Sequence, residues 1–145
     1  MLLSDFHPRS TLVTKITPVI KPRFPVMDTH NHLAEPFGGG WDQRPVPELL
    51  HRLDEAGVGT YVDLDGGWGE EILHRHLDYF KNAAPERFCI FGGVDWAAWP
   101  EQGNQFGEWA ASRLRKQAAS CAEGLKVWKD FGLKVQDQHG KLVAV

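Results

Sequence analysis

Apolar residues follow two different spacings along the chain, and their alternation predicts strands separated by helices. Short apolar and β-branched runs predict strands near residues 24–32, 60–64, 87–94 and 124–128. Apolar residues three or four positions apart predict helices at residues 47–56, 70–82 and 104–121. Since strands and helices alternate with mostly short connectors, we predict an α/β protein with a parallel sheet covered by helices.

Glycine and proline positions divide the chain into an arm and one domain. Residues 1–23 contain Pro8, Pro18 and Pro22 and predict an extended amino-terminal arm, followed by a domain over residues 24–145. Between the first strand and the first helix, Gly38-Gly39-Gly40-Trp41 predicts a flexible lip over a pocket.

Polar and aromatic residues gather where the predicted strands end. His30 and His32, Asp65 with Trp68, Asp95 with Trp96, and Lys129 with Asp130 occupy these positions. Ligands of parallel α/β folds bind at the carboxyl ends of the strands. We therefore expect a functional site at the rim of a barrel-like sheet.

The sequence Asp28-Thr29-His30-Asn31-His32 carries the most specific signal for chemistry. Side chains of a strand alternate between faces, so His30 and His32 point to the same side. Two imidazoles directed at one point supply half of a four-coordinate zinc site. The competing interpretation is a histidine pair that only forms hydrogen bonds with its neighbours. His74-x-His76 has the same spacing within a predicted helix, where the two rings point apart, and is rejected as a ligand pair.

Four further residues are candidates for contact with the substrate or for support of the metal ligands: Asp65, Asp95, Trp96 and Lys126. On the second strand, Val62 and Leu64 are expected to face the helices, which leaves Asp65 on the other face with Asp63. Asp65 either reaches the site or holds the following glycine turn. Lys126 should point inward, where we favour an ion pair with Asp63 or Asp95 over a role as a base or a metal-bridging group.

Composition narrows the class of protein. The 145 residues are 42% hydrophobic and 24% charged, with a net charge of −3, which is typical of a globular chain with one core. Lys and Arg are scattered, so nucleic acid is not expected as a partner. Cys89 and Cys121 form no disulfide or metal-binding pattern, and no stretch is apolar enough to span a membrane. These features favour a cytoplasmic protein with a small-molecule substrate.

Four segments resemble the amidohydrolase superfamily, in the branch that includes aminocarboxymuconate-semialdehyde decarboxylase. They are residues 24–33, Leu64-Asp65-Gly66-Gly67-Trp68-Gly69, Phe91-Gly92-Gly93-Val94-Asp95-Trp96 and Gly124-Leu125-Lys126-Val127-Trp128-Lys129. The resemblance implies a (β/α)8 barrel of TIM type in which His30 and His32 bind a divalent metal, usually zinc. It also implies metal-dependent hydrolysis or, alternatively, decarboxylation.

The resemblance covers only the first half of such a barrel. Residues 24–145 account for four of the eight strands, so we expect an incomplete barrel that lacks the later ligands of the family and is inactive alone. A non-catalytic half-barrel, which forms a homo-oligomer or pairs with a complementing carboxyl-terminal half, is the main alternative to an enzyme. A third interpretation is a carbohydrate-binding module that uses Trp68, Trp96 and Trp99.

Overall fold

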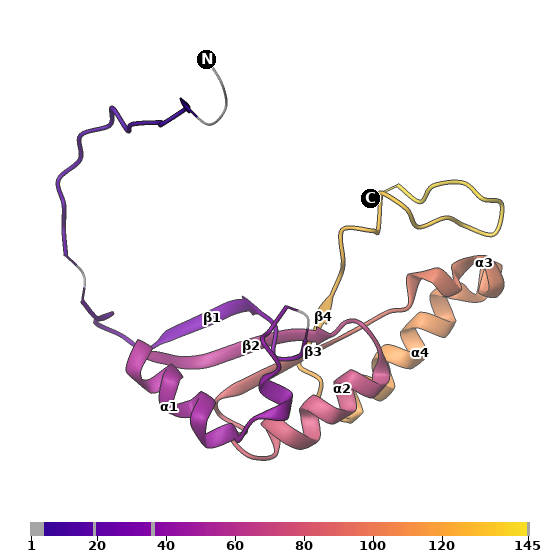
Figure 1. Cartoon of the computed structure of the whole chain (residues 1–145). Helices are drawn as coiled ribbons and strands as arrows, with labels where there is room; N and C mark the ends of the chain where they lie inside the picture. Colours follow the sequence, from indigo (N-terminus) through magenta and orange to yellow (C-terminus); the bar gives the residue numbers. More distant parts are fainter. Residues whose placement is uncertain (1–4, 19, 36, 145) are drawn as a thin grey trace.

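The computed structural model describes residues 5–18, 20–35 and 37–144 and contains one four-stranded parallel sheet (Figure 1). The strands are β1 (Val26–Asn31), β2 (Val58–Gly66), β3 (Phe88–Gly93) and β4 (Gly124–Lys126). Each strand pairs with the next one in the sequence, in the order β1-β2-β3-β4. The strands and the helices between them form an open half-barrel, which confirms the predicted α/β class and the incomplete barrel.

The helices lie on one side of this sheet (Figure 1). They are α1 (Val46–Ala56), α2 (Glu70–His76), the short α3 (Trp99–Gln102) and α4 (Phe106–Ala119). A π-helical segment, Leu77–Lys81, continues directly from α2, so together they cover the predicted helix at residues 70–82. Helix α1 ends at Gly57, which has a φ of 73° and donates its N–H to Asp54 and Leu53. Glycine adopts this left-handed conformation without strain, so the helix ends where the sequence predicts.

The main core lies between the sheet and helices α1 and α2. Phe80 and Phe88 pack with ring centroids 5.3 Å apart and are almost completely buried. Leu33, Leu49 and Leu73 belong to the same cluster. Trp41 is half-buried and packs against this core, so it does not form the predicted lip over a pocket. The loop folds back because an indole ring buries more apolar surface there than it would at a rim.

The predicted faces of β2 are reversed. Tyr61 packs against Phe88 in the helix-facing core, and Asp63 bonds to His76 of α2. Strand alternation then places Val62 and Leu64 on the concave face. The prediction failed because it assumed that only the helix side needs apolar residues, whereas the interior of a barrel is itself filled by branched apolar side chains.

The two ends of the chain extend away from the half-barrel (Figure 1). Residues 6–18 and 20–25 form no helix or strand, and Leu12, Val13, Ile16 and Ile20 are largely exposed. Beyond β4, Gln136 and Leu142 form an antiparallel bridge that closes a small hairpin. No helix in the described part of the chain is long and apolar enough to cross a bilayer.

The hairpin should open in acid. Asp137 accepts hydrogen bonds from the backbone N–H groups of Lys141 and His139 at 2.9 and 2.8 Å, which lower the pKa of its carboxyl. Because the folded-state pKa is lowered, the contribution to stability is present above the ordinary pKa and is lost as the pH falls through the lowered one. We expect both amide protons to lose protection below about pH 4 in NMR exchange measurements. Asp137→Asn, which keeps an acceptor that does not titrate, should remove this pH dependence.

Candidate metal centre

His30 and His32 lie at the carboxyl end of β1, with ring centroids 5.9 Å apart and planes inclined by 67°. His30 is exposed and His32 is half-buried. Neither nitrogen of His30 forms a hydrogen bond within the described part of the chain, and His32 uses only Nδ1. The rings are therefore neighbours with free nitrogens, as a shared metal requires.

Asp65 fixes the orientation of the His32 ring. His32 Nδ1 lies 2.5 Å from Asp65 Oδ1, and Asp65 Oδ2 accepts the backbone N–H groups of Leu33 and Ala34 at 2.7 Å. When the carboxylate of Asp65 is the acceptor in this contact, Nδ1 of His32 carries the hydrogen and Nε2 of the neutral ring presents a lone pair. A carboxylate behind a histidine is the usual support of a metal-ligating imidazole. The donor set therefore fits a divalent metal held through Nε2.

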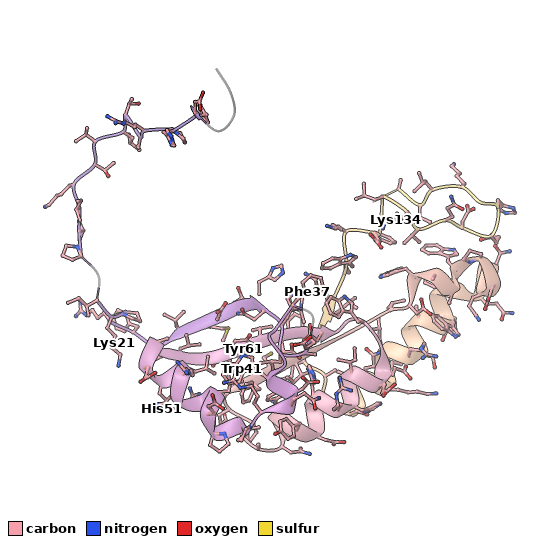
Figure 2. All side chains as sticks on the ribbon, in the orientation of Figure 1. Lys21, Phe37, Trp41, His51, Tyr61 and Lys134 are labelled. Atoms are coloured by element: carbon pink, nitrogen blue, oxygen red, sulfur yellow. The ribbon has the colours of Figure 1, made fainter. Side chains whose placement is uncertain are left out.

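Aromatic rings enclose His32. Trp68 stacks on it with a centroid distance of 5.4 Å and an interplanar angle of 13°, and Phe37 contacts both rings. Phe37 is seen above the end of the sheet in Figure 2. Tyr61 donates its hydroxyl to the carbonyl oxygen of His32 at 3.0 Å. Burial raises the pKa of Tyr61, so the phenol remains a neutral donor. His32 is thus held from the ring face, from Nδ1 and from its backbone.

A second group lies beneath the sheet, and it can also hold a metal. Ligand atoms of Asp63, Asp65 and His76 lie within 4.8 Å of one another, and all three side chains are fully buried. His76 Nδ1 lies 2.6 Å from Asp63 Oδ2. His76 Nε2 has no hydrogen-bond partner among the described residues, and a carboxylate oxygen of Asp42 lies 3.9 Å from it.

Most acceptor positions of this buried group are already used. Both oxygens of Asp65 accept hydrogen bonds, and Asp63 is bonded to His76. Burial raises the pKa of Asp63, and the hydrogen bond and charge of His76 oppose that rise. A metal at this position would have to displace the hydrogen shared by Asp63 and His76. Among the described residues, Nε2 of His76 is the atom of this group that stays without a partner, so a metal could reach the group through that nitrogen only if it also displaced existing hydrogen bonds.

Asp95, Trp96 and Lys126 lie on neighbouring strand ends but do not meet His32. Asp95 accepts the backbone N–H of Ala97 at 3.0 Å, and Trp96 packs against Phe106 and Phe131. Lys126 pairs in register with Gly93, and its Nζ lies 5.5 Å from the centroid of the Trp128 ring.

The favoured ion pair of Lys126 is not formed. Within the described residues Lys126 has no salt bridge, and Asp63 is bonded to His76 instead. The lysine instead lies over an indole, which attracts a cation through its ring face. Of the three tryptophans considered for carbohydrate binding, Trp68 and Trp96 line a cavity, while Trp99 stacks on Phe106 at 4.3 Å.

Sequence reasoning missed His76 and Asp63. His74 and His76 do point apart, as predicted, since His74 is exposed and His76 is buried. The signal for His76 was its position between two core residues, Leu73 of α2 and Phe80 of the π-helical segment that follows. This side of the helix faces polar residues of β2. A histidine on such a face needs a polar partner in the core.

The fold and the site define an open α/β half-barrel with a histidine pair at one strand end and a buried Asp–Asp–His group beneath it. Comparisons with protein-family models, with curated proteins and with solved structures found no match for this chain.

Proposed function

We propose that the chain is half of a metal-dependent hydrolase and that it holds a divalent ion, most suitably zinc, through Nε2 of His30 and His32. The observation that carries this proposal is the contact of 2.5 Å between Asp65 and His32 Nδ1. It sets the tautomer that zinc requires, because only a ring nitrogen without a hydrogen can ligate. The resemblance of residues 24–33 to the opening strand of amidohydrolases supports the same interpretation.

A bound zinc ion acts as a Lewis acid and lowers the pKa of water from 15.7 to about 7. The residues of this chain would position the zinc ion. Asp65 orients His32 and is itself held by two backbone N–H groups, so rotation of the ring would break its contact with a carboxylate that is fixed in place. Trp68 stacks on one face of the ring, and Phe37 contacts it. Two imidazoles leave coordination positions for further ligands and a substrate, which is compatible with hydrolysis or with decarboxylation.

A non-catalytic half-barrel is the second candidate. In the described sheet, β1 and β4 each pair with a single strand, so both edges are open. Leu125 and Met27 on these edges are 40% and 60% exposed. Open apolar edges favour association with further strands, either from a second copy or from a complementing half. This assembly would complete the barrel without requiring catalysis by this chain.

Zinc titration in competition with a chromophoric chelator tests the proposal. We expect one equivalent to bind, and His30→Ala/His32→Ala to weaken binding at least about hundredfold, since each lost ligand or its support costs ten- to hundredfold. His51→Ala/His74→Ala removes two exposed helical histidines and serves as the matched control. Binding that survives the first double variant would refute the proposal.

A further inference from the structure

The helices of this chain cover one face of its sheet, whereas all-parallel sheets are normally covered on both faces. The four strands run in the same direction, and β1 and β4 form the two edges of the described sheet (Figure 1). The half-barrel therefore has an inner face without helices and two open edges. A further element has to cover them if this sheet is to be buried as other parallel sheets are.

Exposed apolar side chains concentrate next to these two edges. Apart from Phe37 and Tyr79, the large apolar residues that are exposed in the described part of the chain lie within residues 6–27 and 125–142. The first range leads into β1, and the second begins within β4. Concentrated apolar surface of this kind marks a face where another protein chain binds.

The direction of the strands identifies a second copy of this chain as the partner that fits both edges. Closed barrels of parallel strands and helices have eight strands. Rotation by 180° about an axis along the barrel converts the four strands of one copy into the missing four and keeps their direction. Strand β4 of each copy then pairs in parallel with β1 of the other, and all edges are closed. Pairing of two β1 strands would instead leave each β4 edge open.

Strand β4 can be extended by such a partner. Its last residue, Lys126, pairs with Gly93, which is also the last residue of β3, so β3 offers no further strand residue to the segment that follows. Val127 is 47% exposed, although the apolar pattern of residues 124–128 predicts a longer strand. The six-residue β1 of a second copy would give this segment the neighbour that it lacks.

We propose that two copies of this chain form a symmetric dimer that closes one eight-stranded barrel through two seams. Each seam is the parallel pairing of β4 of one copy with β1 of the other. The dimer rests on the half-barrel that is the second candidate function above, and it requires no zinc. Because the carboxyl ends of neighbouring parallel strands lie at one rim, His30 and His32 lie beside Trp128 of the partner subunit. Each candidate metal centre is then lined by both chains.

Sedimentation equilibrium of the full chain in EDTA tests this proposal. We expect twice the mass of one chain at micromolar concentration. A monomer would overturn the proposal and would leave the two edges to a partner of different sequence. A series of species larger than a dimer would also overturn it, since strands would then add without closing a barrel.

Substitutions at the two edges separate closure from other modes of association. Met27→Glu on β1 and Leu125→Glu on β4 each place a carboxylate in both seams, so each should raise the Kd of the dimer at least about hundredfold. Both side chains are partly exposed in the single chain, so circular dichroism should show that the variants keep the fold. Ser112→Glu adds the same charge at an exposed position of α4 and should leave the Kd unchanged. A dimer that survives either edge variant would overturn the proposal, because pairing through one kind of edge needs only that edge.

A mixture of Met27→Lys and Leu125→Glu chains gives an independent test. In a mixed dimer, one seam joins two unaltered edges, and the other joins two altered edges of opposite charge. We therefore expect the mixture to form dimers at a concentration at which each variant alone is monomeric. A mixture that stays monomeric would contradict closure through two seams. Because every measurement contains chelator, these outcomes are independent of whether His30 and His32 hold zinc.

Discussion

Asp63→Ala is expected to lower the free energy of unfolding by about 3 to 5 kcal/mol, the usual cost of removing one partner of a buried ionic pair. Asp63 and His76 are both fully buried, and the variant leaves the imidazole of His76 without its hydrogen-bond acceptor. The removed side chain also leaves a void beneath the sheet. Urea denaturation followed by circular dichroism measures the loss.

A double-mutant cycle separates the pair from the void. If Asp63 and His76 act as a pair, Asp63→Ala/His76→Ala should cost less than the sum of the two single variants, with a coupling energy of about 0.5–3 kcal/mol. Additive losses would show that the contact of 2.6 Å contributes nothing to stability. Addition of EDTA to the His30→Ala/His32→Ala variant, which lacks the proposed zinc ligands, should leave its stability unchanged, since the buried pair holds a hydrogen in place of a metal. A chelator-induced loss in that variant, absent once Asp63→Ala is added, would place a metal in the buried group.

Asp65→Asn is expected to reduce zinc affinity about 10–100-fold while the fold is largely retained. The amide oxygen can still accept the N–H groups of Leu33 and Ala34, so the loop after β1 keeps its backbone contacts. The amide NH₂ then faces His32 Nδ1, which becomes an acceptor and moves the hydrogen to Nε2. His32 would present the wrong nitrogen to the metal.

Competition titration measures this loss, and Asp95→Asn is its control. Asp95 also lies at a strand end and caps a short helical turn, but it does not contact His32. We expect Asp95→Asn to bind zinc like the wild-type protein. If Asp65→Asn also bound zinc normally, the carboxylate would have no role in orienting the ligand.

The order of strands and helices was predictable because each element carries its own pattern. Gly57 ends α1, and the β-branched and apolar residues of β2 and β3 mark the central strands. Strand β4 is shorter than predicted and ends at Lys126, so the segment through Trp128 continues without strand pairing. The residue at which a strand ends depends on whether the neighbouring strand is long enough to pair with it. The local pattern of apolar residues carries no information about the length of that neighbour.

The site was predictable only in part. The spacing of His30 and His32 predicted a ligand pair with supporting residues, and Asp65 was one of four candidates for that support; the structure brings Asp65 to His32. The buried pair of Asp63 and His76 was not predictable from alternation, since both faces of β2 carry apolar neighbours. The pair forms only because α2 packs across β2 in this orientation, and local sequence patterns do not predict how a helix packs on a sheet.

The tautomer of His32 is the most direct test of the central claim, that Asp65 prepares this ring to bind metal through Nε2. Long-range ¹H–¹⁵N NMR of the metal-free protein at neutral pH distinguishes the two neutral forms of each histidine. We predict that His32 carries its hydrogen on Nδ1, that zinc shifts its Nε2 resonance, and that Asp65→Asn reverses the tautomer. A hydrogen on Nε2 of His32 in the wild-type protein would contradict the account.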